Sequence, residues 1–145
     1  MAQAHLYQVN VQYDEERKGT LSSEVLNHTI EIATPPEFPK GMPGIWSPEH
    51  YFLAAVNGCL MTTFLAIAEN FKLNFNDFKS DSEGKLEVVD GKYMMSEVLL
   101  KPVITIGSEE DRALAEKIIL KSEKACLISN SVKSTISMDF EIIVA

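Results

Sequence analysis

The chain has 145 residues, of which 46% are hydrophobic and 23% charged, a composition that is typical of a soluble folded domain and excludes a disordered chain. This length is sufficient for one domain with a hydrophobic core, and we expect a single domain over residues 1–145. The formal net charge of −8, without any Lys/Arg-rich run, argues against partners such as nucleic acid or an anionic membrane surface.

The first third of the chain has the pattern of an antiparallel hairpin. Apolar and polar residues partly alternate over residues 5–13 and again over 21–33, and the charged segment 14–19 separates the two runs. Residues 34–46 hold four prolines and two glycines, which predicts a loop. A loop of this length in a compact domain is often functional.

A strong helix start follows this loop. Ser47 supplies an N-cap hydroxyl, Pro48 suits the first helical position, and Glu49 lies at the positive end of the helix dipole. The helix is predicted to run to about Asn70, and its surface is apolar nearly all round. We expect burial on every side, which a chain of this size achieves by enclosing the helix in a homodimer.

The apolar stretch of this predicted helix could also be a membrane span. Polar residues interrupt it, and acids rather than bases flank it at Glu49 and Glu69. Residues 1–10 lack the basic-then-apolar layout of a secretory signal. We therefore expect a cytoplasmic protein without a membrane helix.

The second half of the chain predicts a hairpin, a helix and a last strand. Strands over 85–89 and 92–106 are joined through an Asp-Gly turn, and Pro102 suggests an edge or a bulge. Ser108 begins a second amphipathic helix that ends near Cys126, and residues 134–144 alternate as a strand. The predicted order is ββ-α-ββ-α-β, an α+β fold.

The two cysteines, Cys59 and Cys126, are the only ones in the chain, and each lies on or at the end of a predicted helix. Two cysteines without a secretory signal indicate a reducing compartment, where paired thiols are more often catalytic than structural. An apolar environment raises a thiol pKa, so a reactive Cys59 needs a nearby cation, for which Arg17 is the candidate.

Glu49 is the residue that could orient this guanidinium. Ten helical residues, about 15 Å, separate Glu49 from Cys59, so the two can meet only if a second copy of the helix contributes one of them. The residues thus suggest a site that two chains share.

Both cysteine segments resemble motifs of the OsmC/Ohr family, the osmotically inducible protein C and organic hydroperoxide resistance proteins. Residues 47–55 resemble Asn-Pro-Glu-x-Leu-x-Ala-Ala, with a cysteine ten residues after the Glu, although Ser47 stands in place of Asn. Residues 126–130 resemble Cys-Pro-x-Ser-x-Ala, with Leu127 in place of Pro, and residues 17–19 resemble an Arg-Asp-Gly turn. The resemblance spans nearly the whole chain.

This resemblance implies an intertwined, cofactor-free homodimer with antiparallel sheets around two central helices, and thiol-dependent reduction of organic hydroperoxides to alcohols. It implies that Cys59 attacks the O–O bond and that Cys126 then forms a disulfide with it. It further implies that Arg17 stabilises the developing charge, that Glu49 holds Arg17, and that a dithiol reductant of the lipoyl type restores the thiols.

Less specific interpretations of these residues remain open. Cys59 and Cys126 can be small core residues, Glu49 a dipole-favoured acid, and Arg17 a solvated turn residue. His50 suits a structural role, Trp46 either lines an entrance or packs against the helix start, and the spacing of possible ligands does not predict a metal site. A second function from another class is a non-catalytic dimer that binds a small apolar ligand or senses redox state.

Overall fold

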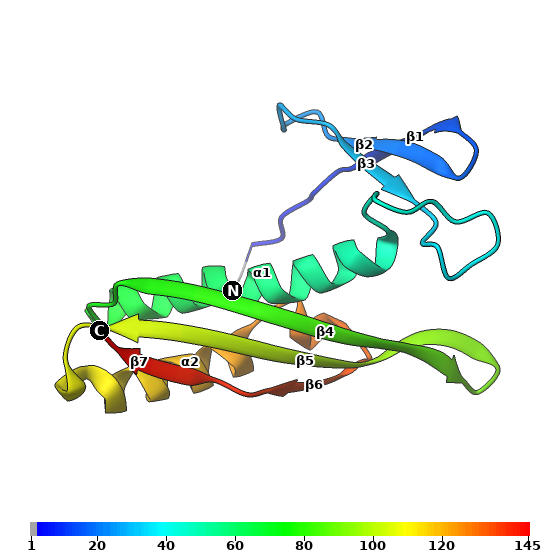
Figure 1. The fold of residues 1–145 in the computed structure, drawn as a ribbon. Helices are drawn as coiled ribbons and strands as arrows, with labels where there is room; N and C mark the ends of the chain where they lie inside the picture. Colours follow the sequence, from blue (N-terminus) through cyan, green and yellow to red (C-terminus); the bar gives the residue numbers. More distant parts are fainter. Residues whose placement is uncertain (1–2) are drawn as a thin grey trace. The chain divides into compact units, whose positions relative to one another are not determined.

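The computed structural model describes residues 3–145, and the predicted α+β class is confirmed (Figure 1). The chain divides into two compact units, the first ending at Tyr51 and the second extending over Phe52–Ala145. In chain order the elements are β1 (Asn10–Glu15), β2 (Lys18–Ser22), β3 (Ile30–Ala33), α1 (Pro48–Asn70), β4 (Asp77–Val89), β5 (Lys92–Ile106), η1 (Glu109–Asp111), α2 (Arg112–Ala125), η2 (Ser129–Ser131), β6 (Thr135–Met138) and β7 (Glu141–Val144).

The sheet of the first unit is antiparallel, with the strand order β1-β2-β3. The predicted hairpin is confirmed, since β1 reverses into β2 at Glu16 and Arg17. The predicted second strand over 21–33 is wrong in its extent. The polar residues between Ser22 and Ile30 leave the sheet, so this run divides into the end of β2 and a separate β3.

The loop predicted over residues 34–46 is confirmed as a segment without helix or strand. The N–H of Ala33 donates to the carbonyl oxygen of Trp46 at 3.0 Å, and the N–H of Met42 donates to the carbonyl of Thr34 at 2.9 Å. These bonds close the loop on itself, so that it ends next to the strand it leaves and enters α1 at a fixed point.

The start of α1 is capped as predicted. Ser47 Oγ accepts the N–H of His50 at 3.3 Å, and in return the N–H of Ser47 donates to Nδ1 of His50 at 3.2 Å. This reciprocal pair is a capping box in which histidine replaces the usual Glu or Gln. The backbone amides of Ser47 and His50 thereby each have an acceptor.

In the single chain only one face of α1 is fully buried, and the expected burial on every side, which requires a homodimer, stays a prediction. The buried residues recur every fourth position: Val56, Leu60, Phe64 and Ala68. Met61 and Leu65 on another face are each 40% exposed. In the folded chain α1 therefore has one buried face and one exposed face, although its sequence is apolar all round.

The second unit has a mixed sheet, which corrects the expectation of purely antiparallel sheets. β4 and β5 form the predicted hairpin, but the predicted first strand over 85–89 is too short, since β4 begins at Asp77 and pairs with β5 along its whole length. Both turn residues, Asp90 at φ 51° and Gly91 at φ 78°, have the positive φ of a type I′ turn. The run 134–144 divides into β6 and β7, and both of these pair with β5 in parallel.

Pro102 lies inside the central strand β5 rather than at an edge. It pairs with Ser80 of β4, while on the other side β6 ends opposite Leu100 and β7 begins opposite Val103. The proline is therefore opposite the break between two short strands, where a missing N–H costs the least. The bulge of this hairpin lies elsewhere, between Lys85 and Leu86.

The second helix agrees with its prediction at both ends. Ser108 Oγ accepts the N–H of Glu110 at 3.3 Å and caps the short helix η1, which leads directly into α2. Cys126 is the C-cap of α2, with an extended backbone at φ −63° and ψ 110°. The cysteine thus lies where the helix ends and the chain turns.

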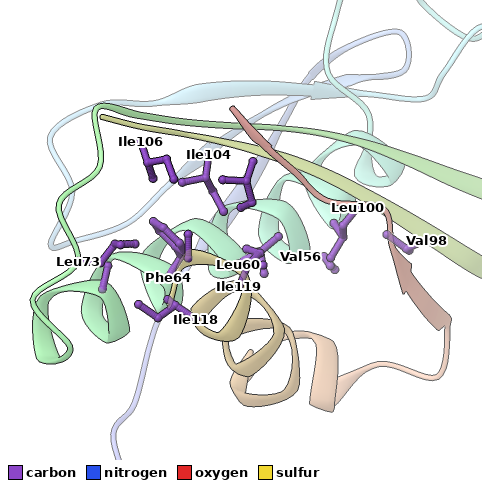
Figure 2. Packing of buried hydrophobic residues seen from close by; sticks show 13 residues of the cluster. Val56, Leu60, Phe64, Leu73, Val98, Leu100, Ile104, Ile106, Ile118 and Ile119 are labelled. Carbon is purple, nitrogen blue, oxygen red and sulfur yellow. The ribbon is translucent and has the colours of Figure 1, made fainter. Parts of the chain in front are cut away.

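The hydrophobic core of the second unit lies between the helices and the sheet. Figure 2 shows side chains of α1, β5 and α2 pointing toward one another. The buried residues of β5 alternate along the strand, as expected for a sheet with one covered face: Val98, Leu100, Pro102, Ile104 and Ile106. Ile118 and Ile119 of α2 complete the cluster.

Among the described residues, α1 is the one helix with the length and apolar composition to cross a membrane. Core helices of soluble proteins share this property. One face of α1 packs in the hydrophobic cluster, and the side-chain amide of Asn57 donates to the backbone carbonyl of Ser80 at 2.7 Å.

Candidate active site

The two cysteines lie together in the second unit. Cys59 lies in the middle of α1, and Cys126 follows the last residue of α2. Both are free thiols, and the two are close enough for each to influence the pKa of the other. Cys59 is half-buried, whereas Cys126 is fully buried, and its thiol also lies 3.9 Å from the carbonyl oxygen of Val56.

The pKa of Cys59 is lowered from its ordinary value. Burial alone would raise it, but donors around the sulfur outweigh burial: the amide of Ile128, the thiol of Cys126, the hydroxyl of Thr63 and the amide of Leu127. The Thr63 Oγ1 atom lies 3.8 Å from Sγ of Cys59. Hydrogen bonds to the charged form of a group favour that form, so these donors stabilise a thiolate.

The pKa of Cys126 is raised instead. Burial is the main cause, the side chain and amide of Ser129 partly oppose it, and the neighbouring Cys59 raises the pKa further. Two interacting thiols cannot both ionise easily, so the first proton leaves Cys59. Of the two thiols, Cys59 is therefore the one that ionises more easily.

Arg17 lies in the first unit, in the exposed turn between β1 and β2. Its carbonyl oxygen accepts the N–H of Thr34 at 3.2 Å, and no carboxylate pairs with its guanidinium among the described residues of that unit. A pocket of about 670 Å³ adjoins this turn, lined by Glu16, Arg17, Lys40, Gly41, Met42 and Pro43. The guanidinium is thus available to a partner.

Glu49 lies in the first turn of α1, and its Oε1 atom is buried without a hydrogen-bond partner among the described residues. A buried carboxylate oxygen without a donor is unfavourable. No ion pair joins Glu49 to Arg17 within residues 3–51. The helix α1 runs unbroken from Glu49 to Cys59, roughly three turns later.

The four predicted site residues therefore fall into two groups. The structure brings Cys59 and Cys126 together in the second unit, whereas Arg17 and Glu49 belong to the first unit and do not pair there. Residues 3–145 contain no cluster of three His, Cys, Asp or Glu side chains able to hold a metal ion.

Known proteins match both this fold and this sequence. The family model of OsmC-like proteins matches residues 41–141. The chain belongs to the OsmC-like protein family. This assignment covers α1, both cysteines and most of the second unit.

Relatives in sequence and in structure support the same assignment. Uncharacterized protein YmaD of Bacillus subtilis (strain 168) is 28% identical over 148 residues, covering 97% of this chain and 95% of its own length. An OsmC-like protein of unknown function from Vibrio cholerae has a similar structure, with a TM-score of 0.83, 21% identity and coverage of 94% and 99% of the two chains.

A structure named as an organic hydroperoxide resistance protein, from Elizabethkingia anophelis, has a TM-score of 0.77 at 18% identity and covers both chains fully, at 100% each. At these identities the structural neighbours establish the OsmC-like fold of this chain. Membership of the family is consistent with a redox role related to peroxides.

Several contacts of this OsmC-like site were not predicted. The Thr63 hydroxyl has the helical i, i+4 spacing from Cys59 and could have been found from the sequence. The amides of Leu127 and Ile128 could not, because a main-chain donor leaves no side-chain signal. The structure also places Trp46 against the helix start, with ring centroids 6.1 Å from His50 and 5.4 Å from Tyr51.

Proposed function

We propose that this protein is a homodimeric thiol peroxidase that reduces organic hydroperoxides to alcohols through Cys59 and Cys126. The observation that carries the proposal is the pair of adjacent free thiols whose pKa values shift in opposite directions. Titratable neighbours with divergent pKa values are the usual mark of divided chemical roles.

In the first step the Cys59 thiolate attacks the terminal oxygen of a hydroperoxide ROOH. The S–O bond forms as the O–O bond breaks, the alkoxide leaves and takes up a proton to become ROH, and Cys59 becomes a sulfenic acid. The half-buried position of Cys59 suits this step, since the sulfur must reach a substrate while its charge is held by protein donors.

In the second step the Cys126 thiol attacks the sulfenic sulfur. The S–S bond forms, and the sulfenic oxygen leaves as water with the proton of Cys126. A dithiol, proposed to be of the lipoyl type, then exchanges with this disulfide and returns both cysteines to thiols while it is itself oxidised. Cys126 is fully buried, which suits a thiol that reacts with the sulfenic acid of Cys59 and not with peroxide directly.

Arg17 and Glu49 are proposed to complete the site. Arg17 would stabilise the charge on the leaving oxygen, and Glu49 would orient the guanidinium by a fork-to-carboxylate pair. The unpartnered Oε1 of Glu49 and the exposed, unpaired guanidinium of Arg17 support this pairing. We propose that it forms in a homodimer, in the reducing environment of the cytoplasm, where the thiols stay available.

The experiment that tests the proposal counts thiols. Fully reduced protein is mixed with one equivalent of cumene hydroperoxide, and free thiols are measured over seconds. The wild type is expected to lose two thiols per chain and release one equivalent of cumyl alcohol. Cys59→Ser should consume no peroxide, whereas Cys126→Ser should complete one oxidation and then over-oxidise at Cys59 when peroxide is in excess.

Slow loss of thiols that is the same in the wild type and in Cys59→Ser would end the peroxidase proposal. In that case the cysteines are packing residues or slow redox sensors, and binding of a small apolar ligand becomes the function to test. Equal and mild effects of the two serine variants would contradict the separate roles given to Cys59 and Cys126.

A further inference from the structure

Trp46 is the single tryptophan of the chain, and it lies at the surface of the first unit. It ends the loop that enters α1, and its carbonyl oxygen accepts the N–H of Ala33 at 3.0 Å, so β3 holds its main chain in place. The residue is nevertheless 55% exposed. The main chain of Trp46 is therefore fixed while much of its indole ring stays uncovered.

Two hollows adjoin this residue. The larger has a volume of about 510 Å³, and its walls include Ile30, Glu31, Gly44, Ile45, Trp46 and Tyr51. The smaller has a volume of about 240 Å³ and shares Gly44, Ile45 and Trp46 with the larger, while His50 completes its walls. Gly44 has φ +81°, and beyond its chain neighbours no heavy atom lies within 4 Å of the position that a Cβ atom would take. The space beside Trp46 therefore stays open.

The aromatic wall of the larger hollow is held by hydrogen bonds. The Tyr51 hydroxyl donates to the main-chain carbonyl of Glu31, which ties the phenol ring to β3. The ring centroids of Tyr51 and Trp46 lie 5.4 Å apart, with 33° between the ring planes. The indole is thus packed against a ring that cannot turn freely, so this wall exists before a ligand binds.

The larger hollow has no unbalanced charge on its walls. The carboxylate of Glu31 accepts from Nζ of Lys18 at 2.9 Å, and the Tyr51 hydroxyl is already bonded. The side chains of Ile30, Ile45 and Trp46 are apolar. A charged ligand would lose its hydration here without gaining an ionic partner, so the walls favour an uncharged one.

We propose that this hollow is a binding site for a small uncharged ligand with a planar aromatic ring, which packs against the indole of Trp46. Ligand sites are commonly hollows of roughly 300–1,000 Å³ with mostly apolar and aromatic walls. A cavity of about 150 Å³ already takes a benzene molecule, so a volume of about 510 Å³ has room for two fused rings. Flat rings gain from contact with aromatic side chains beyond the area that they bury.

This site is independent of the peroxidase function proposed above. All its walls belong to residues 29–51 of the first unit, whereas the two cysteines belong to the second. A ligand that binds beside Trp46 should therefore bind to Cys59→Ser as it does to the wild type. The two proposals can then fail separately, because one is tested by binding and the other by consumption of peroxide.

The single tryptophan makes the test direct, because Trp46 gives the one indole N–H signal in ¹H–¹⁵N spectra. The reduced wild-type protein is titrated with 2-naphthol and, separately, with decahydro-2-naphthol, which has the same skeleton without a flat ring. The indole signal should move saturably with 2-naphthol, and decahydro-2-naphthol should bind at least threefold more weakly. The anion 2-naphthoate should also bind more weakly than 2-naphthol.

Variants identify the ring that the ligand contacts. Trp46→Leu should weaken binding of 2-naphthol, measured by calorimetry, about three- to tenfold, and Trp46→Phe should weaken it less because an aromatic ring remains. Tyr13→Leu is the matched control, since it removes a 67% exposed ring of β1 that is not among the walls of the hollow. Its affinity for 2-naphthol should equal that of the wild type.

Several results would overturn the proposal. An indole signal that 2-naphthol does not move, or equal affinities for the two naphthols, would exclude a site for flat rings at Trp46. Equal weakening by Tyr13→Leu and Trp46→Leu would exclude this hollow. A second copy of the chain could fill the hollow instead, in which case acrylamide would quench the fluorescence of Trp46 poorly and 2-naphthol would leave its indole signal unmoved. If Trp46→Leu does not fold, the titration of the wild type decides alone.

Discussion

Cys59 and Cys126 have the same side chain, and their surroundings alone separate their chemistry. Donors at Cys59 favour the charged sulfur, whereas Cys126 is fully buried and has a charged neighbour when Cys59 ionises. The difference has a consequence for pH. Between the lowered pKa of Cys59 and the ordinary value of 9.0, Cys59 is mainly thiolate and Cys126 mainly thiol.

The rate of alkylation of the reduced protein by iodoacetamide should therefore rise with pH through a midpoint below 9.0 and then level off. A cysteine in an unfolded peptide should still be gaining reactivity at that pH. Cys59→Ser should lose this early rise, because only the buried Cys126 remains. Early alkylation that persists in Cys59→Ser would assign the lowered pKa to the wrong cysteine.

At this scale the sequence predicted that Cys59 and Cys126 lie close together and missed the groups that lower the pKa of Cys59. Cysteine side chains can be recognised in a sequence, and their helical settings predicted that they lie close together. The amides of Leu127 and Ile128 lower the pKa of Cys59 because of the conformation of a turn, and that conformation cannot be predicted from the side chains. Arg17 was expected to supply this role and lies in the other unit.

At the scale of the element, α1 depends on its first turn. Ser47 is fully buried and exchanges hydrogen bonds with His50 in both directions, and Glu49 lies between them. This cap fixes where the helix begins. It therefore also fixes the direction in which the carboxylate of Glu49 leaves the helix.

Ser47→Ala should lower the free energy of unfolding by about 1 kcal/mol, because the His50 amide loses its acceptor, and Ser47→Gly by only a few tenths. For a chain of this size, the alanine variant should melt about 3–5 °C below the wild type. Thermal unfolding of the three proteins at one concentration provides the comparison. Identical melting temperatures for Ser47→Ala and the wild type would show that the cap contributes no stability.

Elements with a clear boundary signal could be predicted, and those without one could not. The start of β5 follows from the Asp-Gly turn and the start of α1 from its cap, whereas nothing marks the start of β4 at Asp77. β3 and β7 have only four residues each and are formed by pairing with β2 and β5. A period of two residues over so short a run is too weak a signal to separate such strands from their neighbours.

At the scale of the whole molecule, apolar surface remains that one chain does not cover. Met61 and Leu65 of α1 are each 40% exposed, and Leu6 and Tyr7 near the N-terminus are 97% and 94% exposed. Several large apolar side chains exposed on one protein indicate an interaction surface. Together with the buried unpartnered oxygen of Glu49, they support the proposed homodimer.

Light scattering should therefore give a mass near twice 16.2 kDa for the wild type at micromolar concentration. Leu65→Glu should shift the protein toward monomer, because a charge on the exposed face of α1 would be buried without a partner. Leu120→Glu, at a similarly exposed leucine of α2, is the matched control and should remain dimeric. A monomeric wild type, or dissociation by Leu120→Glu alone, would contradict a dimer built on α1.

In the peroxidase cycle proposed above, the complete burial of Cys126 would decide which electron donors can close the cycle. Once the disulfide has formed, an incoming thiol can reach only the sulfur of Cys59, and it expels Cys126 as it attacks. The expelled thiol stays beside the new mixed disulfide and can attack it at once, which returns the donor unchanged. Most attacks by a monothiol are therefore reversed before a second thiol can release the reduced protein. A dithiol competes because its second sulfur is tethered at a high effective concentration and closes its own ring first.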